Sequence, residues 1–373
     1  MLNKENNQEA TGINNSNVNQ AGGNITINNN GVQLADIIPL VDHLVESKLQ
    51  YYYAQGQLKV EERRKSFGAK LTNSLGNKAA DKLYRFNEPS VQYSTRRAAL
   101  GYIKSGDDEQ GEDLIDLLIE RINSKELSTE QNLIDKAIDV LPTLSKNSLK
   151  LLILLAYRDL SFQGIRTKYI EWLNSINPIL DGCENISALD IAYLQQSECT
   201  LGLANLFPHN IYEEEILSKE DLFYRHNITG GQFDEYLRIF GLSESAKGIT
   251  GYASAEELVA INSVIIANPQ ERYAQVQICS SQTLEQVLKN PTFENLRDKI
   301  HKAIKLGPPF SAEEVKRSLI RINLQWEHAL KLLDRGDVIT LRPSLLGYYI
   351  ASRKLSKLSG QKISLDIFID NNQ

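Results

Sequence analysis

Sulfur-containing residues are scarce in this chain, which has three cysteines and one methionine among 373 residues. Cys183, Cys199 and Cys279 are far apart and odd in number. A framework of disulfides or a cysteine-rich zinc site needs closely spaced or paired cysteines, so the sequence argues against both. We therefore predict no cofactor and no bound metal. The low cysteine content fits a reducing cytoplasm.

Long hydrophobic runs are also missing. The most apolar stretch is residues 149–156, LKLLILLA, whereas a transmembrane helix needs about 20 such residues. The first residues, MLNKENN, lack the apolar core of a secretory signal. These two absences predict a cytoplasmic protein with no membrane span, in which residues 149–156 form a core helix.

Charge is absent from residues 11–35, a stretch rich in Asn and Gly. Within it, Val18, Ile25 and Ile27 are β-branched residues with polar neighbours, a pattern typical of a half-buried strand. Because a lone hairpin is marginal in water, three alternatives stay open for this head, residues 1–33. It is a disordered tail, a strand docked on its own body, or a segment that pairs between copies through asparagine ladders. The last predicts a homo-oligomer with Val18, Ile25 and Ile27 at the interface.

The rest of the chain shows helical periodicity, so the predicted fold class is mainly α. We expect a multi-helix bundle over residues 34–208 and a second helical domain over residues 209–373. Asp107 or Asp108, Ser128, Ser145 and Ser311 are placed to cap helices. At the end, a strand near residues 337–341, a helix over 343–359 and an alternating strand over 363–369 predict a strand-helix-strand piece, winged-helix-like in outline.

Catalytic motifs are missing as well. The phosphate-binding G-x-x-x-x-G-K-[ST] loop, G-x-G-x-x-G, H-E-x-x-H and G-x-S-x-G do not occur. A nucleophilic pair of Cys199 with His209 is conceivable, but a small buried thiol is the commoner role for such a cysteine. We predict no catalytic residue and leave open whether the protein is an enzyme, with the balance against it.

Two further functions follow from the charged residues. From Arg297 onward 14 Lys and Arg stand against 8 Asp and Glu, although the whole chain carries −6. This basic third predicts, as one alternative, a nucleic-acid-binding protein that uses Arg342, Arg353, Lys354 and Lys357. Asp113, Asp116 and Glu120 share one helical face and allow a second alternative, a metal-dependent hydrolase or nuclease. An ordinary solvated helix face has the same spacing.

Several segments resemble an uncharacterised bacterial family of helical proteins with an Asn/Gly-rich head. The resemblance rests on short segments along most of the chain: Gln92-Tyr93 with residues 97–106, then residues 111–121, 144–149, 193–199, 221–223, 345–351 and 366–369. This chain departs from that pattern at Glu198, where the family usually has Gly, and at Phe368, where it has Trp. The bundle is also distantly similar to the α-helical abortive-infection (Abi-alpha) proteins.

The second resemblance implies a role in anti-phage defence through binding and assembly, with no catalytic residues to carry over. The expected function is therefore a cytoplasmic bacterial interaction protein that self-associates through its head. Its expected partners are other copies of itself and a phage or host protein.

Overall fold

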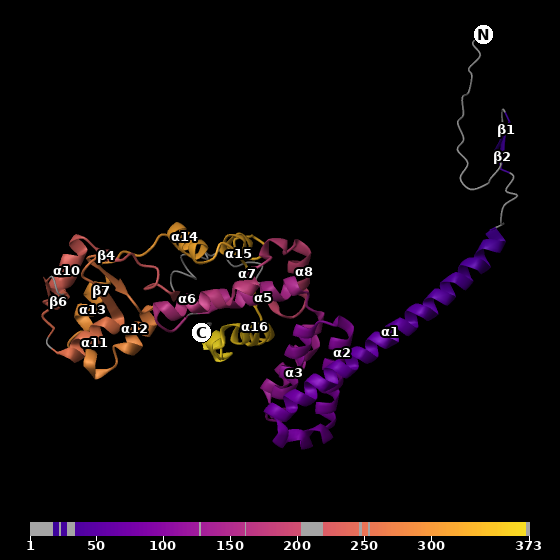
Figure 1. The fold of residues 1–373 in the computed structure, drawn as a ribbon, viewed down its shortest axis with the longest axis horizontal. Helices are drawn as coiled ribbons and strands as arrows, with labels where there is room; N and C mark the ends of the chain where they lie inside the picture. The colour runs from indigo at the N-terminus through magenta and orange to yellow at the C-terminus, as the bar shows by residue number, and fades with distance from the viewer. Residues whose placement is uncertain are drawn as a thin grey trace, which may run out of the picture.

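The computed structural model describes residues 18–21, 24–27, 34–126, 128–160, 162–202, 219–245, 248–252 and 254–370, with side chains from Tyr53 to Phe368. Helices dominate these residues and the strands among them are short, which confirms the predicted mainly α class (Figure 1). No helix in the described ranges combines the length and the apolar composition that a membrane crossing requires.

The first described elements are a hairpin and a long helix. Strands β1 (Val18–Ala21) and β2 (Asn24–Ile27) pair antiparallel, with Val18 opposite Ile27. Helix α1 (Leu34–Lys78) follows, and at about 1.5 Å per residue it is about 68 Å long. Every residue of α1 from 53 to 60 is exposed, and its first described buried residue is Phe67. Its C-terminal part therefore packs on the bundle, while residues 53–60 extend from it (Figure 1).

The bundle is built from helices joined by short connections, as expected of antiparallel neighbours. These are the 3-10 helix η1 (Ala80–Asn87), α2 (Pro89–Ser105), α3 (Asp108–Asn123), α4 (Thr129–Val140) and α5 (Lys146–Asp159). Three predicted caps are confirmed: Asp107, Ser128 and Ser145 each accept a hydrogen bond from the backbone N–H three residues later. Helix α5 lies at the centre, with residues 151–158 all buried, so the prediction of a core helix there is correct.

Later segments return to this same core. Helices α6 (Arg166–Ser175), α7 (Asn177–Leu180) and α8 (Ala188–Gln196) pack near α5, and so do α14 (Ala312–Ile322), α15 (Trp326–Leu333) and α16 (Leu345–Ser359). Strand β3 (Thr200–Gly202) pairs antiparallel with β9 (Leu341–Pro343). Ser311 caps α14 in a complete capping box with Glu314, as predicted.

Residues between these segments form a unit with its own core. It contains α10 (Gly231–Phe240), α11 (Ala255–Val264), α12 (Ser281–Val287) and α13 (Arg297–Ile304). Strands β4 (Ile228–Thr229), β8 (Tyr273–Val276) and β7 (Ile265–Asn268) make an antiparallel sheet in the order β4-β8-β7, and β5 (Ser243–Ser245) pairs with β6 (Gly248–Thr250). Most of its buried residues from Leu222 to Ile304 form a separate cluster, whereas Phe223, Tyr224 and Cys279 belong to the cluster of the bundle. We call it the inserted unit.

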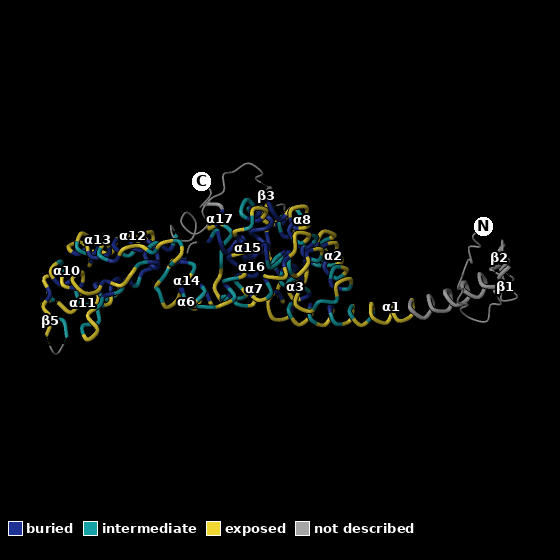
Figure 2. The backbone as a smooth tube through the Cα atoms, turned by 90° about the horizontal axis from the view of Figure 1, so that it is seen from above, coloured by how far each residue is buried: buried dark blue, intermediate teal, exposed yellow. Residues whose placement is uncertain are grey.

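The predicted domain division differs from this arrangement. We placed a boundary between residues 208 and 209, with one domain on each side. The buried residues from Val315 to Phe368 instead share a cluster with those of α2 to α8, because α15 and α16 bury their apolar faces there. The bundle is thus made of two separate stretches of chain, and the inserted unit joins it between them (Figure 2).

The predicted final strand is wrong. Residues 366–370 form a short helix, α17 (Asp366–Asp370). Phe368 is 1% exposed and stacks on Tyr348 of α16, with ring centroids 4.5 Å apart. One anchored aromatic residue decides the conformation here, and the alternation of Ile and polar residues does not. A strand-helix-strand piece is therefore absent from residues 337–370, where β9 is the one strand and helices follow it.

Candidate functional site

Helices α3 and α16 face one another with opposite charges. Helix α3 carries carboxylates at three- and four-residue spacings, which place them on one side of the helix. They are Glu109, Glu112, Asp113, Asp116 and Glu120. Helix α16 presents Arg353, Lys354 and Lys357 to that side, and Lys78 reaches it from the last turn of α1. The facing charges of α3 and α16 come from residues more than 200 positions apart in the chain.

Ion pairs link these two rows. Lys354 pairs with Asp113 and, at 2.8 Å, with Glu109. Lys357 lies 3.3 Å from both Glu112 and Asp113. Lys78 pairs with Asp116 at 2.7 Å. The Lys354 side chain is only 9% exposed, so these contacts replace the water that its ammonium group would otherwise bind.

Arg353 makes a different set of contacts. It pairs with Glu120 and donates a hydrogen bond to the Tyr349 hydroxyl at 3.3 Å. That hydroxyl donates in turn to Glu120 at 2.6 Å. Burial lowers the pKa of Arg353 to about 10, against the opposing effect of Asp116 and Asp113. The guanidinium stays charged at neutral pH, but burial destabilises its charged form more than Asp116 and Asp113 stabilise it.

The Lys357 ammonium has the opposite balance. Burial disfavours its charge, but Asp113 and Glu112 outweigh that cost and raise the pKa of Lys357. For Glu109, the ion pair with Lys354 lowers the pKa of the carboxyl. The carboxylates therefore outweigh burial at Lys357, whereas burial outweighs them at Arg353.

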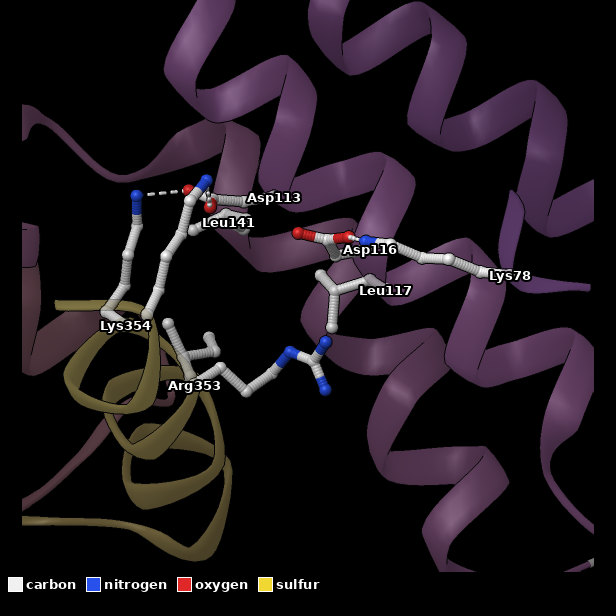
Figure 3. A pocket seen from close by; sticks show the side chains of 9 residues that line it. Lys78, Asp113, Asp116, Leu117, Leu141, Arg353 and Lys354 are labelled. Atoms are coloured by element: carbon white, nitrogen blue, oxygen red, sulfur yellow. Dashed lines mark hydrogen bonds and ion pairs between the residues drawn. The ribbon is translucent and has the colours of Figure 1, made fainter. Parts of the chain in front are cut away.

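A pocket of about 300 Å³ opens between α1, α3 and α16 (Figure 3). Figure 3 shows Lys354 beside Asp113, Lys78 beside Asp116, and Arg353 extended past Leu117. The lining has four cationic and two anionic side chains over an apolar wall of Leu117, Leu141 and Ile350. A second pocket of about 220 Å³ shares Asp113, Lys354 and Lys357 with it and has further apolar walls. Such a mixture of apolar surface and few polar groups is typical of small-molecule sites.

This geometry bears on both charge-based alternatives. Asp113, Asp116 and Glu120 do lie on one helical face, as predicted, but each pairs with a lysine or arginine. The described part of the chain has no group of three or more residues suited to hold a metal ion. Arg353, Lys354 and Lys357 are brought together, but toward α3. Arg342, on β9, lies 3.4 Å from Asp159.

The remaining predicted residues divide into two groups. Cys199 is fully buried, and burial raises the pKa of its thiol, which suits an inert core cysteine. His209, its conceivable partner, lies outside the described residues. Val18, Ile25 and Ile27 lie in β1 and β2, as the head pattern predicted, and the register places Val18 opposite Ile27 and Ile25 opposite Gln20.

Sequence reasoning missed Lys78, Glu109 and Glu112 as members of the pocket region. A signal for them was present: carboxylates over residues 109–120 and cations over residues 353–357 have matching helical spacing. The pairing of one row with the other depends on the tertiary fold, since helical spacing alone does not say which helices meet.

The comparisons with known proteins give one match. The model of a family described as ":-like" matches residues 31–369, which leaves β1 and β2 outside the matched range. No curated protein matches the chain, and no solved structure does either.

Proposed function

The chain belongs to the family described as ":-like", and on that premise we propose that it is a cytoplasmic bacterial interaction protein that self-associates through its head. We assign it to anti-phage defence of the abortive-infection kind. In this proposal the bundle and the inserted unit are the body that a phage or host protein contacts, and the head joins copies of the chain.

The supporting observation is the hairpin of β1 and β2, which precedes a helix that extends from the bundle. A two-stranded hairpin alone is marginal in water and gains stability by adding strands. The sequence around it has no charged side chain to oppose strand pairing between copies. On the part of α1 that extends from the bundle, Tyr53 and Leu58 are 70% and 64% exposed, which leaves apolar surface available for contact.

The other two functions have less support. A nucleic-acid backbone is contacted by a row of exposed cations, whereas Arg353 and Lys354 are 24% and 9% exposed and face α3. Metal-dependent hydrolysis needs carboxylates free of competing cations, and those of α3 face lysines and an arginine.

Light scattering of the full chain and of a shortened chain that starts at Leu34 tests the proposal. We expect an oligomer for the first and a smaller mass for the second. Ile25→Asp with Ile27→Asp places charge in β2 and is expected to lower the mass of the full chain. Thr11→Asp, the matched control, adds charge to the same uncharged stretch outside the strands and leaves the mass unchanged. Equal masses for all four proteins refute self-association through the head.

A further inference from the structure

The pocket between α1, α3 and α16 has more cationic than anionic side chains in its lining. Its four cations, Lys78, Arg353, Lys354 and Lys357, come from two helices on either side of α3, and two carboxylates, Asp113 and Asp116, line it with them. The other carboxylates that pair with these cations, Glu109, Glu112 and Glu120, do not line this pocket, although Glu109 lines the adjoining one. The immediate lining therefore has more cations than carboxylates, although the five carboxylates of α3 outnumber the four cations that face them.

We propose that this pocket binds a small organic phosphate. Lys78 and Arg353 approach from α1 and α16, and phosphate has enough oxygens to accept hydrogen bonds from both. A guanidinium donates two parallel hydrogen bonds to phosphate, and an ammonium acts on it as a point charge. Leu117, Leu141 and Ile350 provide an apolar surface for the organic part of the ligand.

Arg353 is the first anchor for the phosphate. Its contacts with Glu120 and with the Tyr349 hydroxyl are both made by Nη1, and a guanidinium has further N–H donors that can meet a ligand. Lys78 is the second anchor: its side chain is 54% exposed at the rim, so it is able to turn from Asp116 to a ligand.

Size and surroundings fit a ligand no larger than a nucleoside monophosphate. The volume of about 300 Å³ is at the lower limit of ordinary ligand pockets. The adjoining pocket, about 220 Å³, continues beyond the Asp113 ion pairs with Lys354 and Lys357. Its apolar walls, among them Leu144, Leu149 and Ile153, lengthen the surface open to the organic part of the ligand.

Isothermal titration calorimetry with the full chain tests this site. The probes are pyrophosphate, adenosine 5′-monophosphate and adenosine, each against sodium chloride of equal ionic strength. We expect the two phosphates to bind with one site per chain and adenosine not to bind. Heats from phosphates that match those of chloride, or binding of adenosine as tight as that of its monophosphate, overturn the proposal.

Two variants locate the binding. Lys78→Gln removes an exposed ammonium at the rim and is expected to weaken phosphate binding about tenfold, the loss of one charged hydrogen bond. Lys59→Gln, an exposed lysine of the same helix outside the pocket lining, is the matched control and keeps the affinity. Arg353→Gln is expected to abolish binding, with circular dichroism to confirm its fold. Equal affinities for Lys78→Gln and Lys59→Gln contradict the assignment, whatever the oligomeric state of the protein.

Discussion

A single carboxyl, Glu220, is buried where the bundle meets the inserted unit. Its side chain accepts a hydrogen bond from the Phe162 backbone N–H at 2.8 Å, and the residue is 3% exposed. Burial raises the pKa of Glu220 from 4.5 to about 8, even though that hydrogen bond opposes the rise. Aromatic residues Tyr157, Tyr169 and Trp326 border the same small cavity. Neutral Glu220 is therefore the form that this surrounding favours.

This gives a pH dependence of stability with a definite sign. Between pH 4.5 and 8 the folded protein keeps a proton that the unfolded chain releases, so the free energy of unfolding falls as pH rises. The contribution is fully present below pH 4.5 and is lost through pH 8, at about 1.4 kcal/mol per pH unit. Glu220→Gln keeps an acceptor for Phe162 and should flatten this slope in denaturant titrations. Exposed Glu313→Gln is the control, and an unchanged slope for Glu220→Gln would contradict the assignment.

Gly347 is a second residue whose identity the packing requires. A Cβ placed on it would clash with the backbone carbonyl oxygen of Cys199 and lie 3.0 Å from Leu152 Cδ1. Because the Cys199 backbone cannot shift without disturbing the surrounding packing, Gly347→Ala should lower the free energy of unfolding by about 2 kcal/mol. Gly336→Ala has no atom within 4 Å of the new Cβ and serves as control. Equal midpoints in urea for the two variants would show that α16 does not approach β3 this closely.

At the scale of elements, local sequence signals predicted helix starts well. Ser145 and Asp107 cap α5 and α3 because a short polar side chain can satisfy a free N–H at the start of a helix, whatever the fold. Residues 363–369 show the opposite case. There the alternation of apolar residues predicted a strand. The structure instead has helix α17, in which Phe368 packs on Tyr348. The pocket could not be predicted from the sequence for the same reason. Helical spacing predicts each of its two rows of charged residues, but the pairing of the rows depends on the tertiary fold.

The α3–α16 interface gives a prediction for a pair of residues. Asp113 and Lys354 have side chains 12% and 9% exposed, so removing one partner leaves the other poorly solvated. Asp113→Asn should lower the free energy of unfolding by about 1–3 kcal/mol. Adding Lys354→Met should recover much of that loss, because it removes the buried ammonium that Asp113→Asn leaves with Glu109 as its carboxylate partner.

Denaturant titrations of both single variants and the double variant measure this coupling. Glu112→Gln changes a carboxylate that is 57% exposed in its pair with Lys357, so we expect a change within about 0.5 kcal/mol. Additive losses in the double variant would mean that Asp113 and Lys354 do not depend on each other.

At the scale of the whole molecule, the uneven charge of the sequence has a structural explanation. The basic final third supplies α16, and the acidic earlier part supplies α3, so the two charge excesses meet inside one protein. The sequence showed the imbalance but suggested an external polyanion as its partner. That interpretation treated the final third as a separate domain, whereas α14 to α16 share the core of α2 to α8.

The two cores also predict how the molecule unfolds. The chain has two tryptophans, Trp172 and Trp326, and both are buried in the bundle. Tryptophan fluorescence therefore reports on the bundle, whereas circular dichroism reports on helices of both units. Phe233 is fully buried in the inserted unit, and Phe233→Ala should destabilise that unit by about 3–5 kcal/mol. For this variant we expect the circular dichroism signal to show a transition at lower denaturant concentration, whereas the midpoint of the fluorescence transition stays unchanged.

Leu154→Ala is the matched variant in the bundle, since Leu154 is fully buried in α5. It should move the fluorescence midpoint, because the cavity forms in the core that holds both tryptophans. The units meet through backbone hydrogen bonds such as Arg166 N–H to Gln277 O at 2.7 Å, and Cys279 N–H to Gly164 O at 3.1 Å. If Phe233→Ala shifts fluorescence and circular dichroism equally, these links are strong enough to make the two cores unfold as one, and the inserted unit has no stability of its own.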